Sequence, residues 1–89
     1  MSFRMVVTGV FRVAASGRTV VTGRVEHGSL RVGDRVEMVR AGVSVPTTVK
    51  GLEVAAKITC EILRGEDAGV LIDDVEGFSI REGDVLSRP

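Results

Sequence analysis

The chain has 89 residues, 44% apolar and 27% charged, which is enough for one compact hydrophobic core and too little for two. Twelve Lys and Arg balance twelve Asp and Glu, and charges interrupt every apolar stretch before it reaches the ~20 residues of a membrane-spanning helix. The single cysteine and single histidine exclude an internal disulfide and a zinc site of the Cys and His type. The composition predicts one cytoplasmic domain over residues 1–89, without a cofactor or a membrane partner.

The charges are unevenly distributed along the chain. Residues 1–50 carry eight Lys or Arg against three acidic residues, and residues 51–89 carry four against nine. Ten of the twelve cations are arginine, whose planar guanidinium suits phosphate and carboxylate groups. The imbalance indicates either a polyanionic or acidic partner, or two halves that interleave in one fold and neutralise each other.

The first predicted element covers residues 3–13, where apolar and polar residues alternate with the period of a strand. This alternation places Phe3, Phe11 and Val13 on the inward face. Later segments show the same period, and the chain has 17 valines, which favour strands. Further strands are predicted around residues 20–25, 35–38, 47–54, 57–63, 67–73 and 84–87.

The predicted strand at 57–63 contains the one cysteine. Cys60 alternates in phase with Ile58 and Ile62, so all three are expected to face the core. A buried thiol has a raised pKa and little access to reagents. We therefore expect Cys60 to be chemically inert.

Two short segments repeat the same pattern fifty residues apart. Leu30-Arg31-Val32-Gly33-Asp34 is echoed by Ile80-Arg81-Glu82-Gly83-Asp84. Seven or so short strands with glycine turns between them predict a small antiparallel barrel or sandwich. In each of the two segments, a hydrophobic residue would cover one end of the barrel, glycine would take a backbone angle that other residues avoid, and aspartate would begin the next strand. The two segments are predicted to be matching structural corners.

No motif in the chain supports catalysis. The stretch from Gly9 to Thr19 superficially resembles a phosphate-binding loop, but Arg12 stands where the motif needs glycine and Arg18 where it needs lysine. His27 lies in a polar Glu-His-Gly-Ser turn and has no serine and acid pattern around it. The sequence predicts a protein that is not an enzyme.

The segment from Ser16 to Val39 carries the run Thr-Val-Val-Thr-Gly-Arg-Val-Glu, followed by a Val-Gly-Asp turn. It resembles the second domain of elongation factor Tu and related translational GTPases. The resemblance continues through Gly51-Leu52-Glu53, residues 65–72 and residues 81–86, and so covers essentially the whole chain. It implies an all-β fold, a closed antiparallel Greek-key β-barrel of about six to seven short strands.

In elongation factor Tu this barrel supplies part of the pocket for the 3′-terminal adenosine of aminoacyl-tRNA. The resemblance places Val20, Glu53 and Leu71 in that pocket, with Asp67 at a position where the family has asparagine. Ionised aspartate only accepts hydrogen bonds and repels phosphate. Strand alternation separately predicts that Val20, Glu53 and Leu71 point outward, and we expect them to meet on one outer surface.

These features predict a non-catalytic binding module that contacts tRNA, ribosomal RNA or a translational GTPase, with Arg18 and Arg24 as phosphate contacts. Two alternatives remain open: a protein–protein adapter barrel without RNA binding, and an excised domain of a larger translational GTPase. RNA binding requires several phosphates to be neutralised together. A continuous arginine surface would favour RNA, and scattered arginines would favour the adapter.

Overall fold

The computed structural model describes residues 2–89, and its regular secondary structure over these residues consists of strands alone. No helix in this part of the chain is long and apolar enough to cross a membrane. The strands are β1 (Phe3–Val13), β2 (Arg18–His27), β3 (Leu30–Arg31), β4 (Arg35–Arg40), β5 (Val43–Val54), β6 (Lys57–Thr59), β7 (Glu61–Ile62), β8 (Asp67–Asp73) and β9 (Val85–Arg88).

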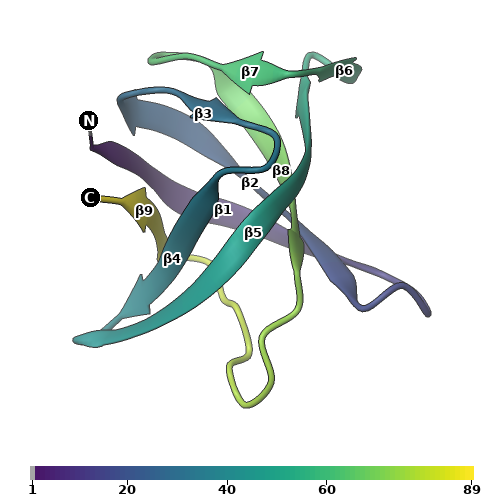
Figure 1. Cartoon of the computed structure of the whole chain (residues 1–89), viewed down its shortest axis with the longest axis vertical. Coiled ribbons are helices and arrows are strands. Elements are labelled where there is room, and N and C mark those ends of the chain that lie inside the picture. Colours follow the sequence, from purple (N-terminus) through teal and green to yellow (C-terminus); the bar gives the residue numbers. More distant parts are fainter. Residues whose placement is uncertain (1) are drawn as a thin grey trace.

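Six strands form a closed antiparallel barrel in the order β4-β9-β1-β2-β8-β5, and pairing between β4 and β5 completes the ring (Figure 1). Strand β6 extends the sheet beyond β5, and β3 pairs with β7 in a small separate sheet. The connections from β2 to β4 and from β8 to β9 join strands that are not neighbours, as in a Greek key. The predicted all-β barrel is confirmed.

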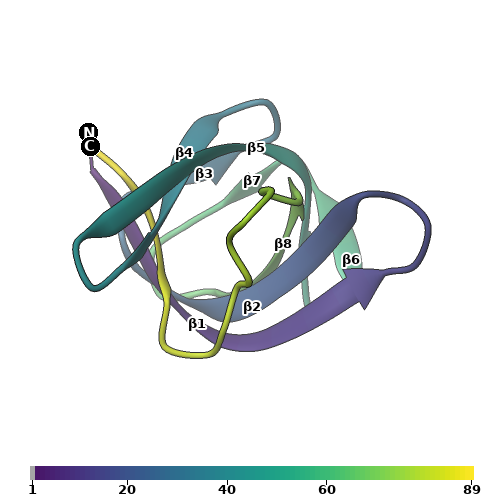
Figure 2. The same ribbon diagram turned by 90° about the horizontal axis from the view of Figure 1, so that it is seen from below.

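The core fills the barrel with side chains from alternate positions of its strands. At the end where β3 and β7 pair, Leu30 and Ile62 are fully buried. At the opposite end, the segment between β8 and β9 crosses the opening (Figure 2) and buries Ile80. The other buried apolar residues are Phe3, Met5, Val7, Val21, Val25, Val36, Met38, Val49, Leu52, Ala68, Val70, Ile72 and Leu86.

The two repeated segments adopt the same hydrogen-bonded corner. The backbone N–H of Arg31 donates to the Asp34 carboxylate, and that of Arg81 donates to the Asp84 carboxylate, both at 2.8 Å. The glycines have φ angles of 95° and 94°, in the region that favours glycine. Each corner also exchanges two backbone hydrogen bonds with a core strand, at Val49 and Val7 respectively. The predicted structural equivalence is confirmed.

The inward placement of Phe11 and Val13 was wrong. Their side chains are 60% and 43% exposed. The pairing of β1 with β2 shifts register between Val7 and Gly9, and this β-bulge puts one extra residue into β1. The alternation is therefore reversed beyond the bulge, so that Val10 packs against the core and Phe11 faces outward.

The predictions for Cys60 and Ile58 were also wrong, whereas Ile62 is buried as expected. The predicted single strand is divided into β6 and β7 by a bend at Cys60, which is exposed. Strand β6 pairs only with β5, beyond the closed ring, and Ile58 is 93% exposed. The break ends the alternation on which the inward assignment depended.

Candidate nucleic-acid interface

The outer face of β2, β8 and β5 carries a row of small and apolar residues. Val20 lies opposite Leu71 in the pairing of β2 with β8, and Leu71 lies opposite Gly51 in the pairing of β8 with β5. Val20 and Leu71 are both half-buried. Since neighbouring strands are ~4.8 Å apart, the row forms a continuous apolar strip across three strands.

A second β-bulge shapes this face of the barrel. The pairing of β5 with β8 shifts register between Val49 and Gly51. Val49 and Leu52 are both buried, so the two residues between them, Lys50 and Gly51, both lie on the outside. Bulges often redirect a side chain near a functional site. Here the bulge brings the Lys50 side chain to the edge of the apolar strip.

The strip forms the floor of a pocket of about 350 Å³, which we call the base pocket. It is lined by Val20, Lys50, Gly51, Leu52, Glu53, Ile58, Gly69 and Leu71. The expected meeting of Val20, Glu53 and Leu71 on one outer surface is thus observed, while their role in binding RNA stays a prediction. Lys50 and Ile58 were missed. A glycine inside a strand often marks a bulge. Gly51 was therefore the one feature of the sequence that could have indicated the bulge that places Lys50 at the pocket.

Glu53 lies across the backbone of Gly69. The two residues face each other in the pairing of β5 with β8, and a Cβ added to Gly69 would come within 2.9 Å of the Glu53 Cγ and Oε1 atoms. A larger residue at position 69 would therefore displace the glutamate side chain. The absence of a side chain at Gly69 lets the carboxylate rest at the wall of the base pocket.

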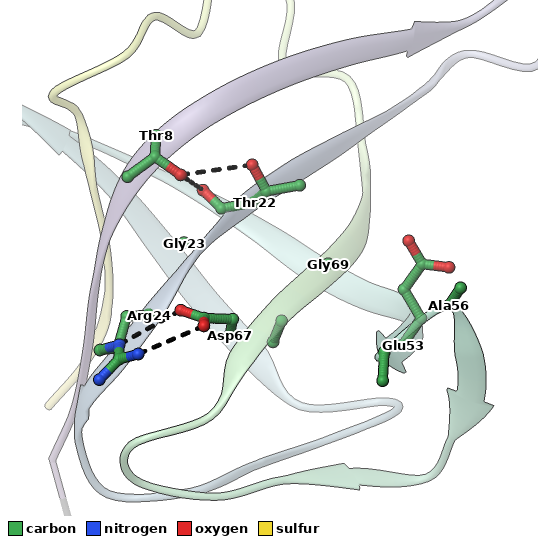
Figure 3. A pocket seen from close by; sticks show the side chains of 10 residues that line it. Thr8, Thr22, Gly23, Arg24, Glu53, Ala56, Asp67 and Gly69 are labelled. Atoms are coloured by element: carbon green, nitrogen blue, oxygen red, sulfur yellow. Dashed lines mark hydrogen bonds and ion pairs between the residues drawn. The ribbon is translucent and has the colours of Figure 1, made fainter.

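A second, more polar pocket of about 370 Å³ (Figure 3) adjoins the first. Glu53 and Gly69 line both pockets. In it, the Thr8 hydroxyl donates to the backbone oxygen of Thr22 at 3.2 Å. Asp67, predicted as a binding residue, lies here rather than in the base pocket and accepts from Arg24 Nε and Nη2 at 3.2 and 3.3 Å. The structure thus divides five of the six predicted site residues between two adjacent pockets, and Arg18 lines neither.

The arginines of the first half are largely paired with acids of the second half. Arg18 Nε lies 3.4 Å from Asp73 Oδ1, on the edge of the base pocket nearest Lys50. Four arginines and one lysine of the first half form such pairs: Arg18–Asp73, Arg24–Asp67, Arg31–Glu61, Arg40–Asp84 and Lys50–Asp73. Arg88 of the second half pairs in the opposite direction, with Asp34. These pairs support the alternative in which the two halves interleave and neutralise each other.

A metal centre is not formed by the described part of the chain. Over residues 2–89, no three side chains of His, Cys, Asp or Glu come together in an arrangement that could hold an ion. The chemistry that the two pockets offer is apolar contact, hydrogen bonding and charge.

Comparison with known proteins agrees with the resemblance seen in the sequence. The model of the family described as elongation factor Tu domain 2 matches residues 18–87. Two crystal structures of translation elongation factor SelB from Methanococcus maripaludis, the apo form and the complex with the GTP analogue GppNHp, each match with a TM-score of 0.85 and 25% identity. Each match covers 98% of this chain and 19% of the SelB chain, so the chain spans about a fifth of SelB. Because the family model matches most of its length, the chain belongs to the family of elongation factor Tu domain 2.

Proposed function

We propose that this barrel, acting as one module over residues 1–89, is a non-catalytic part of the translation apparatus in the cytoplasm. Its base pocket would hold the terminal nucleoside of an RNA, such as the 3′ end of a tRNA, and a translational GTPase would supply the nucleotide chemistry that this chain lacks. One observation carries the proposal. Val20, Glu53 and Leu71, selected both by family resemblance and by strand alternation, line a single pocket.

The chemistry of the base pocket suits a nucleoside. Val20, Leu71 and Ile58 offer hydrocarbon against which a flat base can pack, and Glu53 offers a carboxylate that can accept a hydrogen bond from a ribose hydroxyl. The volume of about 350 Å³ lies in the lower part of the range for small-molecule sites, roughly 300–1,000 Å³. The pocket is large enough for one nucleoside.

The proposal is tested by titrating a short single-stranded RNA that ends in adenosine into the 89-residue chain, followed by NMR chemical shifts. Leu71→Ala removes half-buried hydrocarbon from the pocket floor and should weaken binding about five-fold, equivalent to ~1 kcal/mol. Val43→Ala is the matched control, because Val43 is 55% exposed on β5 and does not line the pocket. The proposal would be contradicted if both variants bound RNA equally weakly, or if neither variant bound it more weakly than wild type.

The protein–protein adapter remains a second candidate, and the ion pairs between the two halves favour it. Paired arginines such as Arg18 and Arg24 are less available to bind several phosphates at once. A pull-down from native cytoplasm, with and without nuclease, separates the candidates. Partners that are lost after nuclease treatment support RNA binding, and partners that persist support the adapter.

A further inference from the structure

The hairpin formed by β1 and β2 continues beyond the closed ring of the barrel (Figure 1). The pairing of β1 with β9 ends at Val6, and the corner that precedes β9 hydrogen-bonds only to Val7. From Thr8 to Val13, β2 is the one strand that pairs with β1 in the described part of the chain. The other side of this stretch is an open strand edge, which we call the β1 edge.

The β1 edge presents backbone hydrogen-bonding groups to solvent. Successive residues of an antiparallel strand turn their N–H and C=O groups alternately toward and away from the partner strand. The Val13 carbonyl points into the turn between β1 and β2, where it accepts from the Ser16 N–H at 3.3 Å. Alternation back from Val13 turns the N–H and C=O groups of Arg12 and Val10 away from β2. Over residues 2–89, no turn or corner supplies a backbone partner to either residue.

The side chains along the β1 edge suit an additional strand. Phe11 and Val13 lie on the outer face and are 60% and 43% exposed. Arg12 alternates with them and is also exposed, and no acid among residues 2–89 forms an ion pair with it. Valine and phenylalanine favour strands. Residues 8–13 lack the proline and lysine that commonly protect an edge from pairing with another chain.

The charge and the alternation of the edge define the strand that fits it. A residue opposite Arg12 would share its face, so a carboxylate there would neutralise the arginine. The residues on either side of that carboxylate would lie beside Phe11 and Val13 and would be apolar. Both kinds of cross-strand pair stabilise a sheet. The pattern that complements the β1 edge is therefore an acidic residue between two apolar ones.

This pattern distinguishes a peptide from two other occupants. A second copy that paired through the same edge would bring a second arginine and no carboxylate, because residues 8–13 contain no acid. A nucleic acid has no peptide backbone that could continue the hydrogen-bonded ladder of β1. Charge complementarity and backbone pairing together favour an acidic peptide.

We propose that the β1 edge is a docking site at which an extended segment of a partner protein adds to the sheet as a strand, with a carboxylate opposite Arg12. The edge lies on the side of β1 that faces away from β2, so a strand added there leaves the base pocket open. The inference goes beyond the proposed function and does not depend on RNA binding.

The test titrates two blocked peptides, Val-Glu-Val-Thr-Val-Thr and its analogue with lysine in place of glutamate, into the 89-residue chain. The glutamate peptide should bind about five-fold more tightly than the lysine peptide, equivalent to ~1 kcal/mol. NMR shift changes should concentrate on residues 8–13. Amide hydrogen exchange should slow at Val10 and Arg12 and stay unchanged at Phe11, whose N–H already faces β2.

Three variants assign the effect to the edge. Arg12→Glu should reverse the preference, so that the lysine peptide binds more tightly, and a reversal cannot come from a folding defect. Arg12→Pro removes an N–H that faces the open edge and not β2, a position that tolerates proline, and should abolish binding of both peptides while the shifts of β8 remain those of wild type. Arg35→Ala, an exposed arginine on β4, should leave the preference unchanged.

The proposal is overturned if neither peptide affects residues 8–13, or if Arg12→Glu keeps the preference of wild type. Sedimentation that shows a dimer lost in Arg12→Pro would assign the edge to a second copy instead. Shift changes at residues 8–13 caused by single-stranded RNA alone would assign it to nucleic acid. The RNA titration of Leu71→Ala reports on the base pocket and fails or succeeds separately.

Discussion

The guanidinium of Arg40 holds the carboxylate of Asp84 with two hydrogen bonds of 2.7 Å, one to each oxygen. Asp84 is only 3% exposed. The same guanidinium donates to the backbone oxygen of Ser79 and lies 4.5 Å from the ring centre of Phe78. Arg40 therefore fastens the segment between β8 and β9 across the end of the barrel.

A matching pair lies at the other corner, where Arg88 Nη1 lies 2.8 Å from the Asp34 carboxylate. Asp34 immediately precedes β4, which ends at Arg40, and Asp84 immediately precedes β9, which ends at Arg88. Because β4 and β9 are antiparallel, the start of each lies near the end of the other. Each strand thus supplies the arginine that neutralises the aspartate of the opposite corner.

Asp84 should make stability depend on pH at the acid end. The hydrogen bond from Arg40 lowers the pKa of the Asp84 carboxyl, against the opposing effect of burial. A lowered folded-state pKa stabilises the fold above the unfolded value of about 3.9, and this contribution is lost as the pH falls through the folded-state pKa. Asp84→Asn should unfold at lower temperature than wild type at pH 7, and its melting temperature should change less than that of wild type between pH 5 and pH 2.

Asp34→Asn is the matched control for this measurement, because Asp34 occupies the equivalent corner with a side chain that is 26% exposed. It should cost less stability at pH 7 than Asp84→Asn. Equal losses of stability in the two variants would show that the buried Arg40–Asp84 pair stabilises the fold no more than the exposed pair. The same conclusion would follow if the melting temperature of Asp84→Asn depended on pH as that of wild type does.

Gly23 should be essential to the packing of β1 on β2. A Cβ at this position would lie 2.3 Å from the backbone oxygen of Val6 and 2.9 Å from the Met5 side chain, and backbone cannot easily move away. Gly23→Ala should lower the free energy of unfolding by about 2–3 kcal/mol, measured by urea denaturation. Gly51→Ala is the control, since its Cβ would make only an ordinary 3.5 Å contact with Leu71; a similar loss there would refute the steric explanation.

Cys60 should react rapidly with a thiol reagent in native buffer, because it is exposed at the bend between β6 and β7. Its labelling rate should differ little between native buffer and urea. Ile62→Cys in a Cys60→Ser background is the control, because position 62 is fully buried and its thiol should be protected until the protein unfolds. Slow labelling of native Cys60 would contradict the exposed bend.

The chain should neither bind nor hydrolyse GTP. Arg12 and Arg18 stand where a phosphate-binding loop needs glycine and lysine, and Arg18 lies within β2 rather than in a loop before a helix. Isothermal titration should show no heat of binding at micromolar GTP, with a phosphate-loop GTPase as the positive control. Micromolar affinity would contradict this prediction.

Alanine variants of Arg18 and Arg24 test whether these arginines neutralise phosphates of a bound RNA. If each contacts a phosphate of single-stranded RNA, replacing it by alanine should reduce the slope of log affinity against log salt by about 0.7 and weaken binding to all sequences alike. Arg35→Ala, an exposed arginine on β4, should leave the slope unchanged. Slopes that do not respond to Arg18→Ala or Arg24→Ala would favour the adapter.

Alternation with a period of two predicted an all-β fold and most of its core, because it holds through β2, β4 and β8, and the resemblance to elongation factor Tu domain 2 added the closed barrel. It failed where the alternation is interrupted. The bulge after Val7 exposes Phe11, the bulge at Lys50 adds a cation to the base pocket, and the bend at Cys60 exposes Ile58. One inserted residue reverses every later side chain.

The candidate site was predictable to a similar extent. Val20 and Leu71 lie in uninterrupted stretches of β2 and β8, and Glu53 lies beyond the bulge in β5, where regular alternation has resumed. Alternation and resemblance therefore agreed about all three. Lys50 and Ile58 depend on the interruptions themselves. Asp67 was placed by resemblance alone, and the ion pair that couples it to Arg24 follows from the register of β2 against β8, which the pattern of apolar residues does not specify in advance.

The reciprocal exchange of arginines between β4 and β9 has a consequence for the order of folding during synthesis. Asp34 leaves the ribosome more than fifty residues before its partner Arg88, and Arg40 more than forty before Asp84. Since β9 also lies between β1 and β4 in the ring, the nascent chain can form its early hairpins but cannot close the barrel until the last strand emerges. Completion of the fold should therefore be a late, cooperative event that follows the emergence of β9 from the ribosomal tunnel.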